Sequence, residues 1–172
     1  MKKKIVYMLL LAFVVAIFIR VFVAEGFVVR GDSMHPAVES GDYVFVNKLA
    51  YWRSEPQRGD IIVATTREGR VRVLKRVVGM PGERFDIKDG KIILRETRTD
   101  EGKVLQELYL TNPQVLTGGE IHTVLDPQEY FVLGDNREVS LDSRQLDYID
   151  KWDIKGRVFG KFNLSKFSYK GL

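Results

Sequence analysis

The sequence predicts a mainly β protein, in which an antiparallel β domain follows a single N-terminal transmembrane helix. Residues 5–24 are almost continuously apolar, and a run of about 20 apolar residues is long enough to cross a bilayer as a helix. After residue 24 the pattern changes to short runs of β-branched and aromatic residues separated by Gly, Asp and Pro turn signals. The length of 172 residues leaves room for one globular domain behind the helix.

The composition narrows the possible functions. Hydrophobic residues make up 45% and charged residues 29% of the chain, as in an ordinary folded protein. Of the formal net charge of +4, three positive charges come from Lys2, Lys3 and Lys4. The other basic residues are mixed with Asp and Glu, without a basic stripe carrying stacking aromatics, so we do not expect nucleic-acid binding. The absence of cysteine excludes disulfides, thiolate metal sites and cysteine nucleophiles.

We interpret residues 1–4 as a cytoplasmic N-terminus, residues 5–24 as a transmembrane anchor and residues 25–172 as an extracytoplasmic catalytic domain, because basic residues stay on the cytoplasmic side. A cleavable signal sequence is one alternative, but a cut after Ala24 would place bulky Phe22 where a small side chain is needed. A buried core helix is another, but the run is apolar on every face. An uncleaved anchor is therefore expected.

Nine short runs are expected to be strands of packed antiparallel sheets. They comprise residues 27–30, 43–49, 61–66, 70–78, 84–87, 91–94, 121–124, 130–133 and 156–162. The turn signals between them lie at residues 40–42, 58–60, 68–69, 80–82, 89–90 and 134–136. Residues 95–120 are more polar and are interpreted as an excursion or small cap that carries Asn112-Pro113, and a helical turn is expected near residues 149–152.

The first segment with chemical potential is Gly-Asp-Ser-Met-His-Pro at residues 31–36. If the alternation of the preceding strand continues through it, Phe27, Val29, Gly31 and Ser33 share one face. That arrangement puts a serine hydroxyl at the end of an apolar groove. Taken alone, the segment is equally consistent with an ordinary polar turn.

The second segment is Val-Arg-Val-Leu-Lys-Arg-Val-Val at residues 71–78. By alternation, Lys75 interrupts a row formed by Val71, Val73 and Val77. An amine that faces an apolar environment loses hydration, which lowers its pKa and lets it act as a general base. The alternative is a lysine at a strand edge that reaches water.

The third segment is Gly-Asp-Asn-Arg-Glu-Val-Ser-Leu-Asp-Ser-Arg at residues 134–144. Asp142 and Arg144 can pair across two positions, and Ser140 can offer a hydroxyl to a neighbouring site. A solvated turn is the alternative when the segment is considered alone.

Together the three segments closely resemble the bacterial type I signal peptidases. The shared patterns are Ser-Met-x-Pro, then Lys-Arg-Val-Val-Gly-x-Pro-Gly, then Gly-Asp-Asn-Arg-x-x-Ser-x-Asp-Ser-Arg, in this order behind one anchor. The resemblance extends to Gly-Arg-Val-Phe-Gly at residues 156–160. It implies the signal-peptidase fold and a membrane-bound endopeptidase that removes N-terminal signal peptides from exported preproteins. Cleavage is expected after small side chains at the first and third positions before the scissile bond.

Position by position, the resemblance implies that Ser33 is the nucleophile and Lys75 its base, in a serine–lysine dyad that forms an acyl-enzyme. The backbone N–H of Ser33 would donate to the oxyanion. Ser140 would orient the lysine amine, and Asp142 and Arg144 would support the site. The residues implied to bind the substrate are Phe27, Val29, Gly31, Met34, Val38, Val44 and Leu74.

The chain departs from the family pattern in places. Gly31 stands where many members have a serine whose hydroxyl adds to the oxyanion hole, although some Gram-positive members also carry glycine. Arg30 replaces a frequent proline, and Glu138-Val139 replaces a common Asp-Asn. The single span and short excursion resemble the compact Gram-positive form.

No cofactor or metal is expected, because the mechanism needs none and the two histidines, His35 and His122, are far apart in the sequence. Both are expected to be bystanders. The expected partners are preproteins that carry signal peptides, together with membrane lipid. Several aromatic residues either form an interfacial patch or are ordinary core and surface groups: Tyr51, Trp52, Phe162, Phe167 and Tyr169.

Two other functions compete. A catalytically silent relative that assembles surface proteins or pili would keep the fold but lack the nucleophile or the base, and this chain has both Ser33 and Lys75. A self-cleaving repressor of the serine–lysine type would need a DNA-binding domain and no membrane anchor.

Overall fold

The computed structural model describes residues 2–67, 71–95, 100–112 and 115–172. The expected turn at Glu68-Gly69, the first residue of the 70–78 run and Pro113 lie outside the described residues, as do residues 96–99 of the polar excursion.

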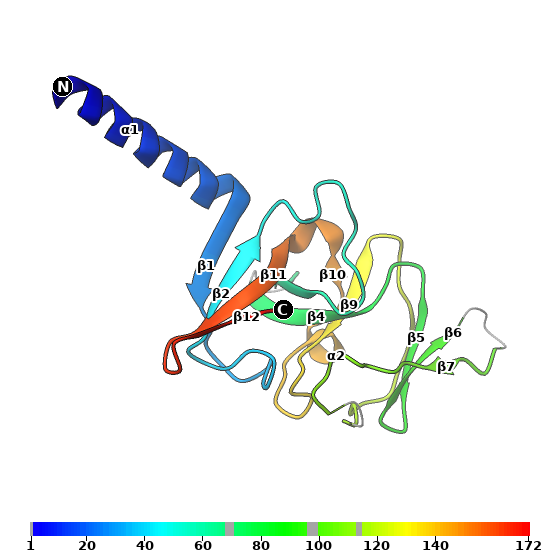
Figure 1. The fold of residues 1–172 in the computed structure, drawn as a ribbon. Coiled ribbons are helices and arrows are strands. Elements are labelled where there is room, and N and C mark those ends of the chain that lie inside the picture. Colours follow the sequence, from blue (N-terminus) through cyan, green and yellow to red (C-terminus); the bar gives the residue numbers. More distant parts are fainter. Residues whose placement is uncertain (1, 68–70, 96–99, 113–114) are drawn as a thin grey trace.

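An apolar helix projects from the domain at its N-terminal end (Figure 1). Helix α1 covers Lys2–Phe18 and continues into a π-helical turn at Ile19–Val23. The stretch Lys3–Val23 is long and apolar enough to cross a membrane, and none of it is buried against the rest of the protein. Strand β1 (Ala24–Val28) follows without a linker, so the helix leads directly into the edge of a sheet.

The main sheet has eight strands, in the order β1-β2-β11-β3-β4-β9-β10, with β12 paired to β11. All of its pairings are antiparallel. Its members after β1 are β2 (Tyr43–Asn47), β3 (Ile61–Thr65), β4 (Arg72–Gly79), β9 (Glu129–Leu133), β10 (Ile149–Asp150), β11 (Ile154–Asn163) and β12 (Ser168–Gly171). A short helix α2 (Ser143–Leu146) lies between β9 and β10.

A smaller antiparallel sheet lies at the end of the molecule away from α1 (Figure 1). Its order is β7-β6-β5-β8. The strands are β5 (Arg84–Lys88), β6 (Lys91–Arg95), β7 (Lys103–Val104) and β8 (Ile121–Val124). The polar excursion predicted at residues 95–120 therefore contributes strand β7 at the edge of this sheet.

The core consists of three buried clusters, and one of them supports the segment that contains Ser33. In this cluster Met34, Val38 and Val44 pack with Leu74 and Val158. Burying one such side chain fully stabilises the fold by roughly 1.5–3 kcal/mol. Met34 and Val38 therefore anchor the loop that follows β1 to the sheet.

The mainly antiparallel β architecture predicted from the sequence is confirmed, and strands occur in all nine predicted runs. The sequence did not reveal the two-residue strands β7 and β10, the terminal strand β12 or helix α2. The helical turn expected near residues 149–152 begins later, because Ile149–Asp150 pairs with β9 and only Lys151–Asp153 forms a 3-10 turn.

Candidate active site

The segment after β1 turns sharply and presents Ser33 on a compact loop. β1 ends at Val28, and Gly31 has a φ of +97°, a backbone conformation that favours glycine. The expectation that strand alternation continues as far as Ser33 is therefore wrong. The loop is closed by hydrogen bonds from Val29 N to Asp42 O (2.8 Å) and from Gly41 N to Val29 O (2.9 Å).

The carboxylate of Asp42 forms hydrogen bonds that fix the end of this loop. It accepts hydrogen bonds from Lys161 Nζ (2.7 Å), Asn163 Nδ2 (2.7 Å) and Glu39 N (3.0 Å). The Asp42 side chain is almost fully buried, and the ammonium of Lys161 compensates its charge. Sequence analysis missed this contact because the partners lie more than a hundred residues apart along the chain.

Lys75 lies on β4 beside an unpaired strand edge. β3 pairs with β4 from Arg72 to Arg76, whereas β9 pairs with β4 only from Arg76 onward. Within the described residues, the edge at residues 72–75 therefore has no strand partner on the β9 side, and it lines a cavity.

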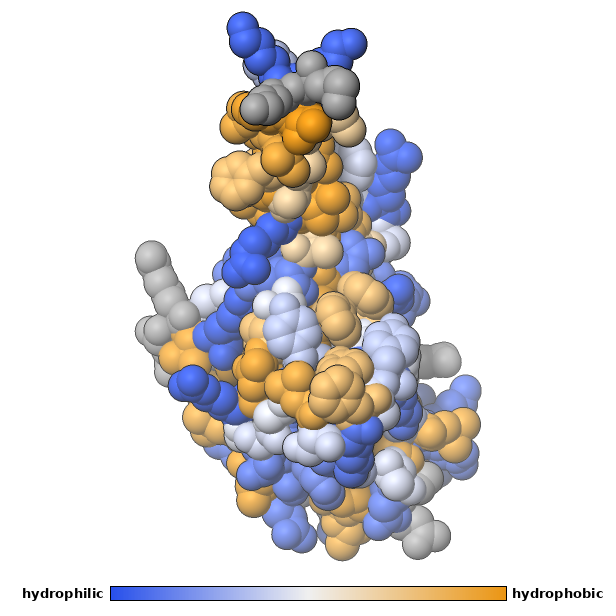
Figure 2. Space-filling model, turned by 60° about the vertical axis from the view of Figure 1, so that its left-hand side comes forward, coloured by the Kyte–Doolittle hydropathy of each residue, from blue (hydrophilic) through white to orange (hydrophobic). Residues whose placement is uncertain are grey.

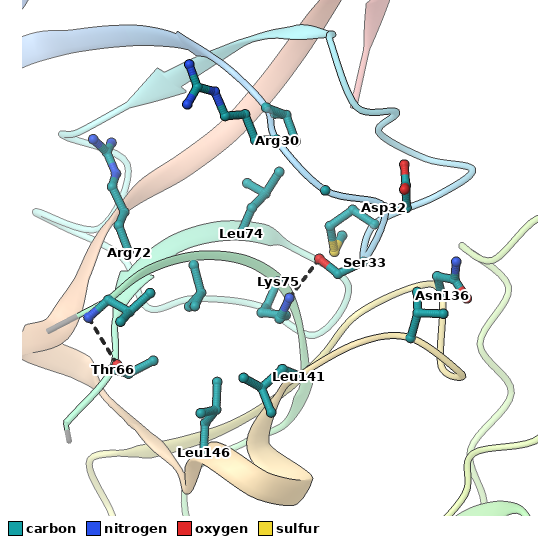
Figure 3. Close-up of a pocket in the computed structure, with 16 residues that line it drawn as sticks. Arg30, Asp32, Ser33, Thr66, Arg72, Leu74, Lys75, Asn136, Leu141 and Leu146 are labelled. Atoms are coloured by element: carbon teal, nitrogen blue, oxygen red, sulfur yellow. Dashed lines mark hydrogen bonds between the residues drawn. The ribbon is translucent and has the colours of Figure 1, made fainter. Parts of the chain in front are cut away.

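The amine of Lys75 lies 2.8 Å from the hydroxyl oxygen of Ser33 (Figure 3). Lys75 is only 5% exposed, and this burial lowers the pKa of its amine. The negative charges of Asp142 and Asp135 raise that pKa, while Arg144 lowers it. Among the described residues no carboxylate lies within ion-pair distance of Lys75. The site thus combines a hydroxyl with a buried amine whose pKa is lowered.

The loop between β9 and α2 is fastened by Asp142. Its carboxylate accepts two hydrogen bonds from the guanidinium of Arg144, at 2.8 and 3.0 Å, and one from Gly134 N at 3.0 Å. It also caps α2 together with Gln145, which satisfies backbone N–H groups at the start of the helix. Arg144 in turn donates to the carbonyl of Arg137 at 2.7 Å. The pair therefore fixes both ends of the loop.

Ser140 lies against the Ser33 loop. A methyl group built on Gly134 would meet Ser140 Oγ at 2.2 Å and the Ser33 carbonyl at 2.4 Å, so only glycine permits this close packing. Asn136 N donates to the same Ser33 carbonyl at 3.0 Å. Within the part of the chain that the structure describes, Ser140 Oγ is buried without a hydrogen-bond partner. The Ser140 hydroxyl can therefore form a hydrogen bond with another group at the site.

A cavity of about 830 Å³ extends from Ser33 and Lys75 along the free edge of β4. Of the residues expected to bind substrate, Val29, Gly31, Met34 and Leu74 line it. Phe27, Val38 and Val44 do not line it. Val38 and Val44 are fully buried in the core cluster, and Phe27 packs against that cluster under the guanidinium of Arg72.

The opposite wall of the cavity comes from residues that sequence analysis missed. Val139 and Leu141 are exposed and point to the cavity, whereas Ser140 and Asp142, which alternate with them, are buried. Leu146 of α2 and Thr66 continue this wall (Figure 3). The apolar residues Val139 and Leu141 inside an otherwise polar motif were a sequence signal that could have revealed this wall.

Two buried ion pairs lie next to the site, and the sequence analysis did not predict them. Arg76 makes a bidentate pair with Asp135 at 2.8 and 2.6 Å. Arg137 pairs with Glu107 of the excursion at 2.8 Å and contacts Thr117. The excursion is therefore tied directly to the loop that carries Ser140.

Comparison with known proteins agrees with this architecture. Residues 2–162 match the family described as "Signal peptidase, peptidase S26". The chain is 35% identical to Signal peptidase I of Bacillus licheniformis over 167 residues, which cover 90% of this chain and 87% of that protein. It is 34% identical to Signal peptidase I T of Bacillus subtilis over 167 residues, with 90% and 83% covered.

A solved structure also matches, that of a signal peptidase I from Enterococcus faecalis. The TM-score is 0.50 at 28% identity, and the match covers 60% of this chain and 97% of that one. A family match over almost the whole sequence, relatives above 30% identity and a related fold all agree. The chain belongs to the signal peptidase family, peptidase S26.

Proposed function

We propose that this protein is a membrane-anchored serine endopeptidase that removes N-terminal signal peptides from exported preproteins, with Ser33 as nucleophile and Lys75 as general base. The observation that carries the proposal is the 2.8 Å contact between a buried lysine amine and the serine hydroxyl in a chain of this family. A hydroxyl becomes a competent nucleophile when an adjacent base removes its proton.

In the proposed mechanism, the neutral amine of Lys75 accepts the proton of Ser33 as Oγ attacks the scissile carbonyl. The protonated amine then delivers that proton to the leaving nitrogen, and an acyl-enzyme remains. Lys75 next takes a proton from water as that water attacks the ester, and returns this proton to Ser33 Oγ as the signal peptide leaves. This is the serine–lysine variant of triad logic.

Three neighbours support this chemistry. Ser140 Oγ, which is buried without a partner in the described part of the chain, can hydrogen-bond the lysine amine and orient it. Arg144 neutralises Asp142, so that the carboxylate does not hold Lys75 in its charged form. The backbone N–H of Ser33 would donate to the oxyanion.

The free edge of β4 accounts for substrate binding. An extended peptide can add to residues 72–75 as a further strand, so that backbone hydrogen bonds provide affinity and pockets provide specificity. Val29, Met34 and Leu74 then offer an apolar surface to the residues before the scissile bond.

The anchor is proposed to span the membrane with Lys2, Lys3 and Lys4 on the cytoplasmic side, which places the β domain outside. Near the anchor, the face of β2, β11 and β12 carries aromatic rings: Phe45 lies 6.0 Å from Phe159 and 6.2 Å from Tyr169. Apolar groups on this face gather next to the anchor in Figure 2. Aromatic rings are favoured at the lipid headgroups, so this face is proposed to contact lipid.

The proposal is tested by incubating the full chain in detergent with a model preprotein and sequencing the N-terminus of the product. We expect one cut directly after the signal peptide, and Ser33→Ala should abolish it. Ser165→Ala, which changes an exposed serine in the loop before β12, should cleave normally. Full activity of Ser33→Ala would exclude Ser33 as the nucleophile.

The catalytically silent assembly factor is not favoured. Such a relative should lack the nucleophile or the base, whereas Ser33 and Lys75 are both present and in contact.

A further inference from the structure

A second hollow lies beside Ser33, separate from the cavity along β4. It has a volume of about 280 Å³ and is lined by His35 and Pro36 from the Ser33 loop, Leu110 from the excursion, and Asn136 and Glu138 from the third segment. Asn136 lines both hollows. The two hollows therefore adjoin at Asn136, whose backbone N–H donates to the carbonyl of Ser33 at 3.0 Å.

The direction in which a preprotein crosses these spaces follows from the position of the anchor. At one end of the β4 cavity Arg72 donates to Glu25 at 2.7 Å, and Glu25 comes two residues after the apolar helical stretch ends at Val23. This end therefore faces the anchor. Under the proposed function, a preprotein reaches the enzyme with the apolar part of its signal peptide still in the bilayer. The residues before the scissile bond must then occupy the Arg72 end, and those after it must leave on the other side of Ser33.

Charges are distributed unequally between the two ends. In Figure 3, Arg30 and Arg72 lie at one end of the cavity, whereas Asp32 and Asn136 lie on the opposite side of Ser33. Glu138 adds a second carboxylate on that side. Among the described residues no ion pair involves Asp32 or Glu138, and both are exposed. Arg137 and Asp135 also line the second hollow, but each is paired, with Glu107 and Arg76 respectively, so Asp32 and Glu138 are the carboxylates on this side without an ion pair in the described part of the chain.

We propose that this second hollow is the subsite for the first residues of the mature protein, and that Glu138 makes it favour a basic over an acidic side chain there. The proposal rests on the proposed function, because it assigns the far side of the same site. Leu110 and Pro36 supply an apolar wall, and Asn136 supplies an amide for the extended backbone.

The test uses three preproteins that share one signal peptide and one cleavage site and differ only at the second residue after the cut, which is Lys, Ala or Glu. The full chain in detergent is assayed with each at low ionic strength. We expect kcat/KM to fall from Lys to Ala to Glu, with a ratio between the Lys and Glu substrates of about fivefold, as for partly exposed charge pairs. The ratio should shrink toward one at high salt.

The Glu138→Lys variant should reduce this ratio to one or reverse it. The matched control is Glu120→Lys, which changes an exposed acid outside the hollow by the same charge and should keep the wild-type ratio. Because the readout is a ratio within each variant, a general loss of activity does not disturb it.

The outcomes separate this inference from the function on which it rests. If none of the three preproteins is cut after the signal peptide, the proposed function fails. If all three are cut with equal kcat/KM, or if Glu138→Lys and Glu120→Lys give the same ratio, the signal-peptidase function stands and the assignment of the second hollow is overturned.

Discussion

Strand β4 carries two neighbouring buried basic residues, Arg76 and Lys75, and only Arg76 has a carboxylate partner among the described residues. On one side Arg76 is held by a bidentate pair with Asp135, so that its charge is matched where it lies. On the other side Lys75 is equally buried but contacts a hydroxyl instead of a carboxylate. A guanidinium keeps its charge in any protein environment and so needs a partner, whereas an amine can lose its proton. Burial without a matching charge lowers the pKa of Lys75, as its proposed role as general base requires.

The largest expected effect comes from removing the unpaired amine. Lys75→Met should lower kcat/KM by at least about 10⁴-fold, because members of a catalytic unit cost that much when lost. A cleavage assay of the kind described for Ser33 measures this loss. Lys88→Met, which changes an exposed lysine on β5, should retain activity. Substantial turnover by the Lys75→Met protein would rule out a lysine base.

The same variant should also be more stable than the wild type. Because burial lowers the pKa of Lys75, the unfolded chain binds more protons at this residue than the folded chain. Lys75 therefore costs folding free energy at neutral pH, and the cost fades as the pH rises toward the unfolded value of about 10.4. Thermal unfolding of both proteins from pH 7 to 10 should show an advantage of Lys75→Met that narrows with pH. An advantage that widens would mean that the charged form is favoured.

Removing Asp135, the ion-pair partner of Arg76, should destabilise the protein, in contrast to Lys75→Met. Asp135→Ala leaves the Arg76 guanidinium buried without its partner, and such changes cost about 3–5 kcal/mol. Urea unfolding of the full chain in detergent measures this loss. Asp153→Ala, which removes the partner of a more exposed ion pair with Lys155, serves as the comparison and should cost less than about 1 kcal/mol. Equal losses would show that burial of Arg76 does not require the carboxylate.

A smaller effect concerns the pH dependence of cleavage. Arg144 lowers the pKa of Lys75, so Arg144→Gln should raise that pKa and move the acid limb of kcat/KM to higher pH. At a pH on this limb the variant should lose several-fold more activity than it does on the alkaline plateau. Arg144→Lys, which keeps the charge, should restore the position of the limb in part. If the acid limb does not move, Arg144 does not influence the pKa of Lys75.

The smallest effect expected is at the turn before Ser33. Gly31→Ala places a side chain at a φ of +97° with open space around it, so backbone strain of about 1–2 kcal/mol is the main cost. Gly118→Ala adds the same methyl group in open space without a positive φ. Thermal melts of the two variants should therefore differ, and identical melting would mean that this turn adapts without strain.

The residues on and around β4 also show which features of the fold and the site could be predicted from the sequence. Period-two patterns between clear turn signals predicted the strands, and the valines around Lys75 predicted its burial. Val38 and Val44 illustrate the limit: the resemblance implied that they line the substrate pockets, whereas they are buried in a core cluster, and matching residues to a family does not distinguish a core position from a cavity wall. The Asp135–Arg76 and Glu107–Arg137 pairs join segments far apart in the sequence, and local patterns carry no information about such contacts. The roles of Ser33 and Lys75 followed from resemblance, because a single serine or lysine is chemically unremarkable.

The junction between the anchor and β1 has a consequence for where substrates are cut. Lys48 Nζ donates to the carbonyls of Arg20 and Val21 at 3.3 and 3.0 Å and pairs with Glu25 at 3.2 Å, which clamps the last helical turn to the sheet. Under the proposed topology, the direct connection between helix and strand would set the height of Ser33 above the bilayer. Under the proposed function, the bond selected for cleavage would be the one that a membrane-embedded signal sequence holds at that height, and a thicker bilayer would shift the selected bond along the preprotein.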